Sequence, residues 1–90
     1  MSVALPWFVY IVRCADDSLY TGVTTDTVRR LNEHNFDDRL GAKYTRPRRP
    51  VNLVFQEACA DRSAACKREA EIKKMSRPAK LKLLQLSCNQ

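Results

Sequence analysis

The sequence has no long hydrophobic run and no recognisable leader. None of its apolar segments approaches the ~18–20 residues that a membrane-spanning helix needs. The apolar N-terminal segment, residues 1–12, has neither a basic beginning nor a small-residue cleavage site. We therefore expect this segment to belong to the folded protein rather than to a signal peptide.

The sequence also lacks the cysteine and histidine spacing of a zinc site. Its four cysteines include no C-x-x-C pair, and its only histidine, His34, is far from all of them in the chain. Zinc sites usually combine such ligands at short spacing, so we expect none here. A disulfide framework is not expected either, and reduced thiols in a cytoplasmic protein are the simplest interpretation. The cysteines are Cys14, Cys59, Cys66 and Cys88.

Acidic residues are too few to balance the basic ones. Ten aspartates and glutamates face sixteen lysines and arginines, which gives a formal net charge of +6. Such an excess favours an anionic partner: nucleic acid, a membrane surface or an acidic protein. The length of 90 residues predicts one domain over residues 1–90.

Hydrophobic patterning predicts an α+β fold in the order β-β-α-β-α-α, with a small three-stranded antiparallel sheet flanked by helices. Residues 7–14 and 19–24 are rich in β-branched and aromatic side chains, and short polar residues between them predict a hairpin. The first strand is apolar on both faces, so we expect it at the centre of the sheet. The other expected elements are a helix over 24–35, a loop over 36–50, a strand over 51–58 and helices over 61–76 and 78–86.

Several residues have a predicted local role in these elements. Gly22 lies inside the second strand, where glycine indicates a bulge or a close backbone approach. Thr25 or Asp26 can cap the first helix, and Arg30 and His34 share one flank of it at i and i+4. The residues of the second helix expected to face the core are Ala65, Ile72 and Met75.

The hairpin contains two tyrosines ten residues apart, one in "FVYIV" and one in "YTG". An arginine and a histidine follow on the first helix, and a glutamate follows in "KREAEIKKMS". The tract "GAKYTR" lies between these helices. In this order the motifs resemble the GIY-YIG nuclease family, above all its small stand-alone bacterial members, over roughly residues 6–82. The matching residues are Tyr10, Tyr20, Gly22, Arg30, His34 and Glu69.

The resemblance implies metal-dependent hydrolysis of DNA phosphodiester bonds, in repair or recombination. Glu69 would bind Mg²⁺ or Mn²⁺, and one carboxylate suffices because Mg²⁺ keeps most of its waters. Arg30 would place a fork of donors on the scissile phosphate. Tyr20 would be the general base, with Tyr10 positioning the water or the phosphate. His34 would assist proton transfer or bind phosphate.

Glu71 is an alternative to Glu69 as the metal ligand. The two positions lie about 200° apart around a helix, so only one of them can face the site. We expect both tyrosines to project from adjacent strands into one shallow basic cleft, together with Arg30 and the glutamate.

A basic loop and a neighbouring helix supply the expected contacts to nucleic acid. These residues carry no pattern for base readout, so binding would depend on phosphates and weaken with salt. Specificity in the family usually comes from an attached domain, so a partner protein or a DNA structure is expected to select the site. The expected contact residues are Arg39, Lys43, Arg46, Arg48, Arg49 and Lys73, with Tyr44 as a stacking platform.

Each site residue also has an ordinary structural explanation. Tyrosines in strands commonly pack a sheet. Arg30 can pair with Asp26, and Glu69 with Lys73, each across one helical turn.

Two departures from the family pattern keep other functions open. An asparagine that other members place after the glutamate helix has no match in residues 76–82, and Val23 stands where some members have lysine. The main alternative is a catalytically weak or inactive nucleic-acid-binding module. A further alternative is a protein-interaction domain that meets an acidic partner.

Overall fold

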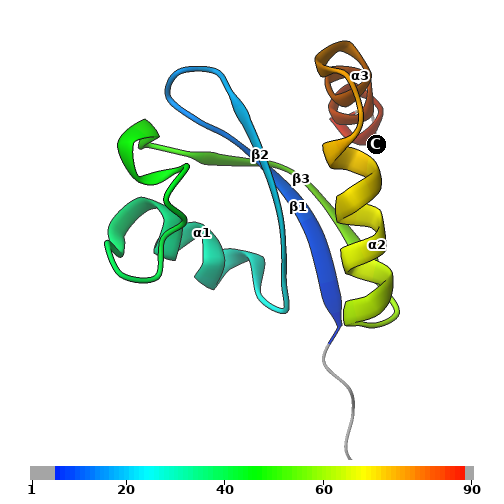
Figure 1. Cartoon of the computed structure of the whole chain (residues 1–90), viewed down its shortest axis with the longest axis horizontal. Coiled ribbons are helices and arrows are strands. Elements are labelled where there is room, and N and C mark those ends of the chain that lie inside the picture. The colour runs from blue at the N-terminus through cyan, green and yellow to red at the C-terminus, as the bar shows by residue number, and fades with distance from the viewer. Residues whose placement is uncertain (1–5, 89–90) are drawn as a thin grey trace, which may run out of the picture.

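The computed structural model describes residues 6–88 and contains one three-stranded antiparallel sheet (Figure 1). Its strands are β1 (Trp7–Arg13), β2 (Leu19–Thr24) and β3 (Asn52–Cys59), in the spatial order β2-β1-β3. The expected central position of the first strand is confirmed. Neighbouring strands pair both of its edges, and its apolar side chains pack into a separate cluster on each face of the sheet.

Three helices complete the predicted order. Helix α1 (Thr27–Phe36) follows β2, and α2 (Arg62–Lys73) and α3 (Arg77–Cys88) follow β3. The loop before β3 contains one short 3₁₀ turn, η1 (Arg46–Arg48). None of the helices within residues 6–88 has the length and apolar character needed to cross a bilayer. The cysteine side chains that the structure places, Cys14, Cys59 and Cys66, are free thiols, and that of Cys88 lies outside the described part.

An aspartate caps the N-terminus of α1 and another caps that of α2. The side chain of Asp26 accepts a hydrogen bond from the backbone N–H of Arg29 (3.0 Å), and Asp61 does the same for Ala64 (2.8 Å). These bonds satisfy donors that a helix leaves unpaired in its first turn. The first helix therefore begins three residues later than predicted, because residues 24–26 form its cap.

The hairpin turn depends on a residue in left-handed conformation. Asp17 has φ of 69°, and its N–H bonds to the carbonyl of Cys14 at 2.9 Å. The N–H of Cys14 closes the hairpin on the carbonyl of Ser18 (2.8 Å). Aspartate tolerates this conformation better than most residues, so "ADDS" forms the tight turn that joins β1 to β2.

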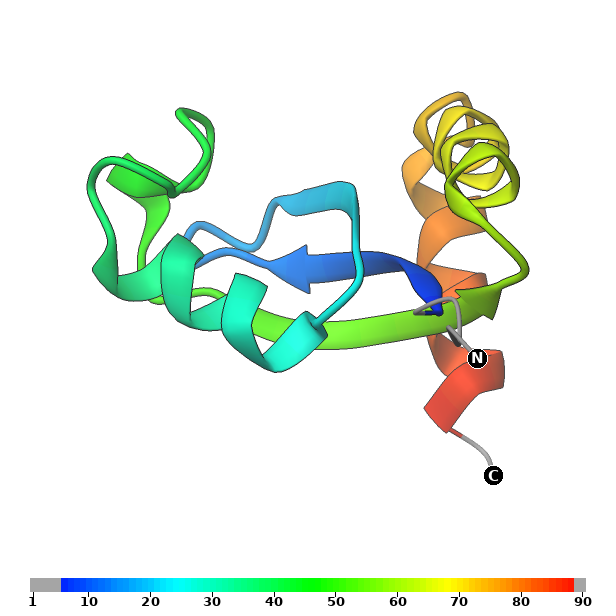
Figure 2. The same ribbon diagram turned by 90° about the horizontal axis from the view of Figure 1, so that it is seen from below.

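The sheet separates two different interiors, with α1 on one side of it and α2 and α3 on the other (Figure 1, Figure 2). On one face, Val9 and Ile11 of β1 pack with Phe55, and with Ile72 of α2 and Leu84 of α3. Successive residues of a strand point to opposite faces. The alternate residues Tyr10, Val12 and Cys14 therefore lie on the other face, with Val51 and with Leu31 of α1.

The core prediction for the second helix holds for two residues and in part for a third. Ala65 and Ile72 are completely buried, and Met75 packs half-buried at the edge of the apolar cluster. This places α2 against the sheet along the line that runs from Ala65 to Ile72. Glu69, which shares this face of the helix, is thereby directed toward the protein.

Candidate functional site

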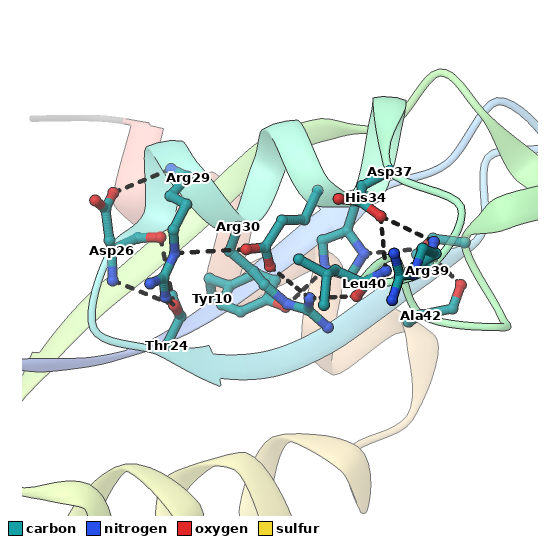
Figure 3. A network of polar contacts seen from close by, with 12 residues as sticks. Tyr10, Thr24, Asp26, Arg29, Arg30, His34, Asp37, Arg39, Leu40 and Ala42 are labelled. Atoms are coloured by element: carbon teal, nitrogen blue, oxygen red, sulfur yellow. Dashed lines mark hydrogen bonds and ion pairs between the residues drawn. The ribbon is translucent and has the colours of Figure 1, made fainter.

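The centre of the candidate site is a hydrogen bond between β1 and α1. The hydroxyl of Tyr10 lies 2.8 Å from Nε2 of His34, and both side chains are buried. Figure 3 shows this pair beneath α1, with Arg30 beside it. Two residues that are 24 positions apart in the sequence thus meet at one point.

The second ring nitrogen of His34 is also engaged. Nδ1 lies 2.9 Å from the hydroxyl oxygen of Thr45, whose own proton is donated to the carbonyl of Ala42 at 3.1 Å. His34 and Thr45 are both completely buried. Burial, with a smaller effect from the nearby Arg30, lowers the pKa of His34 to about 4, so the ring is neutral at physiological pH. With both nitrogens paired and no exposed surface, His34 lies where it cannot touch a phosphate.

Tyr10 keeps its proton in this arrangement. Burial raises the pKa of Tyr10 to about 12, although the neighbouring Arg30 opposes the shift. The pKa of the acceptor, His34, is about 4. A gap of about eight pKa units disfavours proton transfer from Tyr10 to His34 by on the order of 10 kcal/mol. Tyr10 is therefore a protonated phenol rather than a base, and it does not project into an open cleft as expected.

Gly22 is explained by the space that Tyr10 occupies. Gly22 lies opposite Tyr10 in the β1–β2 register. A Cβ atom at Gly22 would lie only 2.5 Å from the Tyr10 hydroxyl oxygen and 2.8 Å from Cζ. The group that comes close to Gly22 is thus a side chain, and not a backbone as predicted. The sheet's irregularity lies elsewhere, between Ile11 and Val12 where β1 pairs with β3.

Tyr20 is the more accessible of the two tyrosines. It comes from β2, on the same face of the sheet as Tyr10, and is half-buried. Its ring meets the edge of His34 with centroids 5.4 Å apart and stacks on Tyr44 at 5.8 Å. The guanidinium of Arg48 lies 4.0 Å from the Tyr44 centroid. An aromatic column therefore runs from the buried imidazole toward the surface of the basic loop.

Arg30 lies between the buried pair and the loop after α1. Its Nη1 donates to Oε1 of Glu33 (2.8 Å) and to the carbonyl of Leu40 (2.7 Å). The predicted alternative of an Arg30–Asp26 pair is wrong, because Asp26 caps the helix with its carboxylate and Glu33 is the nearer acid. Both of these bonds use Nη1, and the guanidinium of Arg30 also lies beside the hydroxyl of Tyr10.

The two candidate metal ligands on α2 differ sharply. Glu69 shares the face of α2 that carries buried Ala65 and Ile72, and its side chain is 23% exposed. Its negative charge is close enough to raise the pKa of Tyr10 slightly. Glu71 points outward with a 60% exposed side chain and pairs with Arg68. The predicted Glu69–Lys73 ion pair is confirmed at 3.2 Å.

The loop arginines are more engaged with the protein than the sequence suggests. Arg49 donates from Nε to the carbonyl of His34 (2.6 Å), and from its two terminal nitrogens to the Asp38 carboxylate (2.8 Å) and the Asp37 carbonyl (3.0 Å). These donors hold the loop onto the end of α1, and the expected contact of Arg49 with nucleic acid stays a prediction.

The other expected contact residues of the loop fall into two groups. Arg46 donates to the carbonyl of Asp38 (3.0 Å), and Arg48 to the carboxylate of Asp16 (3.0 Å) and the carbonyl of Tyr44 (2.8 Å). Arg39 and Lys43 are exposed. These two are the most accessible cations that the loop offers to a phosphate.

The residues present fit a cation that needs few protein ligands. The structure shows no group of three or more histidine, cysteine, aspartate or glutamate side chains that could hold a metal, as far as residues 6–88 are concerned. Mg²⁺ is commonly bound by one or two carboxylates, with water and substrate oxygens completing its shell. Glu69 can supply such a carboxylate, and the ion would compete there with Lys73.

Two polar residues of the site were not predicted from the sequence. Thr45 binds His34, and Glu33 binds Arg30. Thr45 lies inside the tract "GAKYTR", which is typical of the family, but no pattern in the sequence predicts its contact with His34. Glu33 follows Arg30 by three residues, which is a contact distance on a helix.

Comparison with known proteins identifies the class to which this fold and these motifs belong. A family model described as the GIY-YIG catalytic domain matches residues 6–82. The chain therefore belongs to the GIY-YIG family of nucleases. Its relatives include a UPF0213 protein of Desulfotalea psychrophila, 57% identical over 90% of this chain and 73% of its own length. Another, from Haloquadratum walsbyi, is 57% identical over 84% of this chain and 83% of its own length.

Solved structures agree with this placement. The solution NMR structure of a UPF0213 protein from Bacillus halodurans is 43% identical and superimposes with a TM-score of 0.58, over 90% of this chain and 84% of that one. The NMR structure of a protein from E. faecalis is 38% identical with a TM-score of 0.62, over all of this chain and 95% of that one. The resemblance to small members of the family is confirmed.

Proposed function

We propose that the protein is a metal-dependent endonuclease that hydrolyses DNA phosphodiester bonds. The observation that carries the proposal is the meeting of four motif residues from three elements: Tyr10, Tyr20, Arg30 and His34 lie in one cluster between β1, β2 and α1. Glu69 approaches the cluster from α2. Packing alone does not require a neutral histidine and an arginine to converge on two tyrosines, with a carboxylate near enough to act on one of them.

The two tyrosines have different roles in this proposal. Tyr20 is the candidate general base because it is half-exposed, whereas Tyr10 is buried and holds its proton. Arg30 presents its remaining donors to the scissile phosphate, where a planar fork gives orientation as well as charge. Tyr10 and His34 act as positioning residues, because Tyr20 packs against His34 and Arg30 lies beside Tyr10.

Glu69 is the proposed ligand for Mg²⁺ or Mn²⁺. Such an ion supplies positive charge to the phosphate and to the departing oxygen. The protein's own part is to keep the carboxylate directed inward, which the burial of Ala65 and Ile72 on the same face of α2 ensures. Arg39 and Lys43 supply accessible positive charge for the DNA backbone, so binding should weaken as salt rises.

A nucleic-acid-binding module with little turnover is the second candidate. The ion pair between Glu69 and Lys73 favours it, because the carboxylate already has a cationic partner within the protein. This candidate predicts that substituting Glu69 leaves DNA affinity unchanged and that no substrate is cut.

The deciding experiment is cleavage of end-labelled linear, flapped and branched DNA with Mg²⁺ and with Mn²⁺. Wild type is compared with Glu69→Gln and Tyr20→Phe, and with Glu71→Gln as the matched control on the outer face of α2. We expect both site variants to lose ~100-fold or more in kcat/KM and the control to retain full activity.

Other outcomes are equally informative. Equal loss in Glu69→Gln and Glu71→Gln would overturn Glu69 as the ligand. Equal cutting by every variant would indicate a contaminant. Absence of cutting with DNA binding intact would support the second candidate.

A further inference from the structure

The buried imidazole of His34 lies between two hydroxyl groups, and the donor and the acceptor in each of these hydrogen bonds depend on the tautomer of the ring. A neutral imidazole carries one proton, so one ring nitrogen donates and the other accepts. The partners, Tyr10 at 2.8 Å and Thr45 at 2.9 Å, can each donate or accept. The tautomer is therefore set by whatever commits one of the two hydroxyl protons elsewhere.

The hydroxyl proton that is fixed by another partner is that of Thr45. Its hydroxyl lies 3.1 Å from the carbonyl oxygen of Ala42, an atom that can only accept. The same carbonyl accepts the backbone N–H groups of Thr45 and Arg46 at 3.1 Å each, so it is a fixed point of the loop. With its proton directed to Ala42, the oxygen of Thr45 is left to accept from Nδ1–H of His34.

The hydrogen bond on the other side of the His34 ring, to Tyr10, is consistent with this direction. If Nδ1 carries the proton, Nε2 is free to accept the hydroxyl proton of Tyr10. The reverse direction would make Tyr10 the acceptor and would turn its proton elsewhere, although Arg30 with its own positive donors lies beside that oxygen. Donor would then face donor in a buried place, which is costly.

We propose that Thr45 is a positioning residue that sets His34 in the Nδ1–H tautomer and thereby makes Tyr10 a fixed hydrogen-bond donor. The polar chain runs from Tyr10 through His34 and Thr45 to the carbonyl of Ala42. It anchors the basic loop to the centre of the site. The effect on cleavage rests on the proposed nuclease function, whereas the tautomer does not.

The chain offers a direct readout, because His34 is its only histidine. In protein labelled with ¹⁵N-histidine, long-range ¹H–¹⁵N NMR at pH 7 distinguishes a protonated from an unprotonated ring nitrogen. We expect the wild type to show protonated Nδ1 and unprotonated Nε2. A wild-type spectrum with protonated Nε2 would overturn the proposal at once.

Variants then test whether Thr45 is the cause. Thr45→Val keeps the shape but removes the hydroxyl, and we expect a shift toward the Nε2–H tautomer. Thr45→Ser restores the hydroxyl and should restore the Nδ1–H signature. Tyr10→Phe removes the other partner and should leave the Nδ1–H tautomer in place. If Thr45→Val does not fold, the Ser and Phe variants still decide: loss of the signature in Tyr10→Phe would assign control to Tyr10 instead.

Kinetics separate this inference from the proposed function. In an active nuclease, Thr45→Val should reduce kcat by ~10–100-fold with KM nearly unchanged, and Thr45→Ser should recover most of it. A wild type that cuts nothing contradicts the nuclease, but the spectra still decide the tautomer. A tautomer and a kcat that are both the same in Thr45→Val as in wild type would overturn the role of Thr45 while leaving the nuclease standing.

Discussion

The central strand β1 contributes residues to both faces of the sheet, but one face is apolar and the other contains buried polar groups. On one face, Val9 and Ile11 of β1 join apolar residues of β3, α2 and α3. On the other face, Tyr10 of the same strand meets a buried histidine, which in turn meets a buried threonine. The first interior is held by apolar packing, which tolerates many combinations of side chains of suitable volume. The second depends on hydrogen bonds whose partners must each be present.

The difference between the two faces shows how a small protein can bury polar site residues and still have an apolar core. Every described side-chain nitrogen and oxygen that is buried has a hydrogen-bond partner. The cost of burying polar groups on one face is therefore limited. The apolar face supplies the stability that allows the polar face to be arranged for positioning. Substitutions on the two faces should accordingly affect different measurements.

Removing apolar volume should have the largest effect on stability. Ile72 is completely buried in the apolar cluster. We expect Ile72→Ala to lower the free energy of unfolding by about 2–5 kcal/mol, since it leaves a cavity. Urea unfolding measures the loss, and the NMR signature of His34 should stay unchanged in the folded protein. A changed imidazole signature would mean that the two interiors are coupled.

Adding one methyl group on the polar face should have a smaller effect on stability and a larger one on geometry. The new Cβ of Gly22→Ala would press on Tyr10, and we expect a loss of about 1–3 kcal/mol together with a shifted His34 spectrum. A double-mutant cycle with Tyr10→Phe, which removes the nearest atom, should show a positive coupling. Additive effects of the two substitutions would show that this contact is not what requires glycine.

Acid should weaken the polar face alone over a defined range of pH. The pKa of His34 is about 4 in the folded protein and 6.5 ordinarily. The unfolded chain therefore binds more protons between these values, and stability falls as pH falls. From pH 7 to pH 5 the loss should be about 2 kcal/mol.

A matched variant isolates this contribution. Asp16 and Asp37 have lowered pKa values, because hydrogen bonds favour their charged forms, so their effects on stability belong to lower pH. Urea unfolding of wild type and of His34→Gln at pH 7 and pH 5 is the measurement. Equal dependence on pH in the two proteins would contradict the assignment to His34.

Elements with strong local patterns were predictable from the sequence. The strand "LYTGVT" has the predicted bounds, Leu19–Thr24, because a β-prone run lies between a polar turn and a helix cap. Helix ends were less accurate: α2 ends at Lys73 rather than at residue 76, and α3 begins at Arg77 rather than at residue 78. The motif residues were found through family resemblance, and local patterns alone do not bring Glu69 toward the tyrosines.

The partners within the site were the least predictable. Arg30 has acids on either side along its helix, and only the capping role of Asp26 leaves Glu33 as its partner. Arg49 lies in a loop without periodicity, so the carbonyls that bind it depend on how the loop returns to α1. The same holds for Thr45. Such contacts arise from tertiary structure, which a one-dimensional pattern does not contain.

The central place of β1 has a consequence for the order in which the chain assembles during synthesis. Its partner β2 follows after a short turn, so this hairpin can form as soon as about two dozen residues are free. The other partner, Asn52–Cys59, is made much later. Until then one edge of β1 has no partner strand in its own chain, and unpaired edges invite pairing with other chains. The strand at the centre of the finished sheet thus has an edge open to mispairing until β3 has been made.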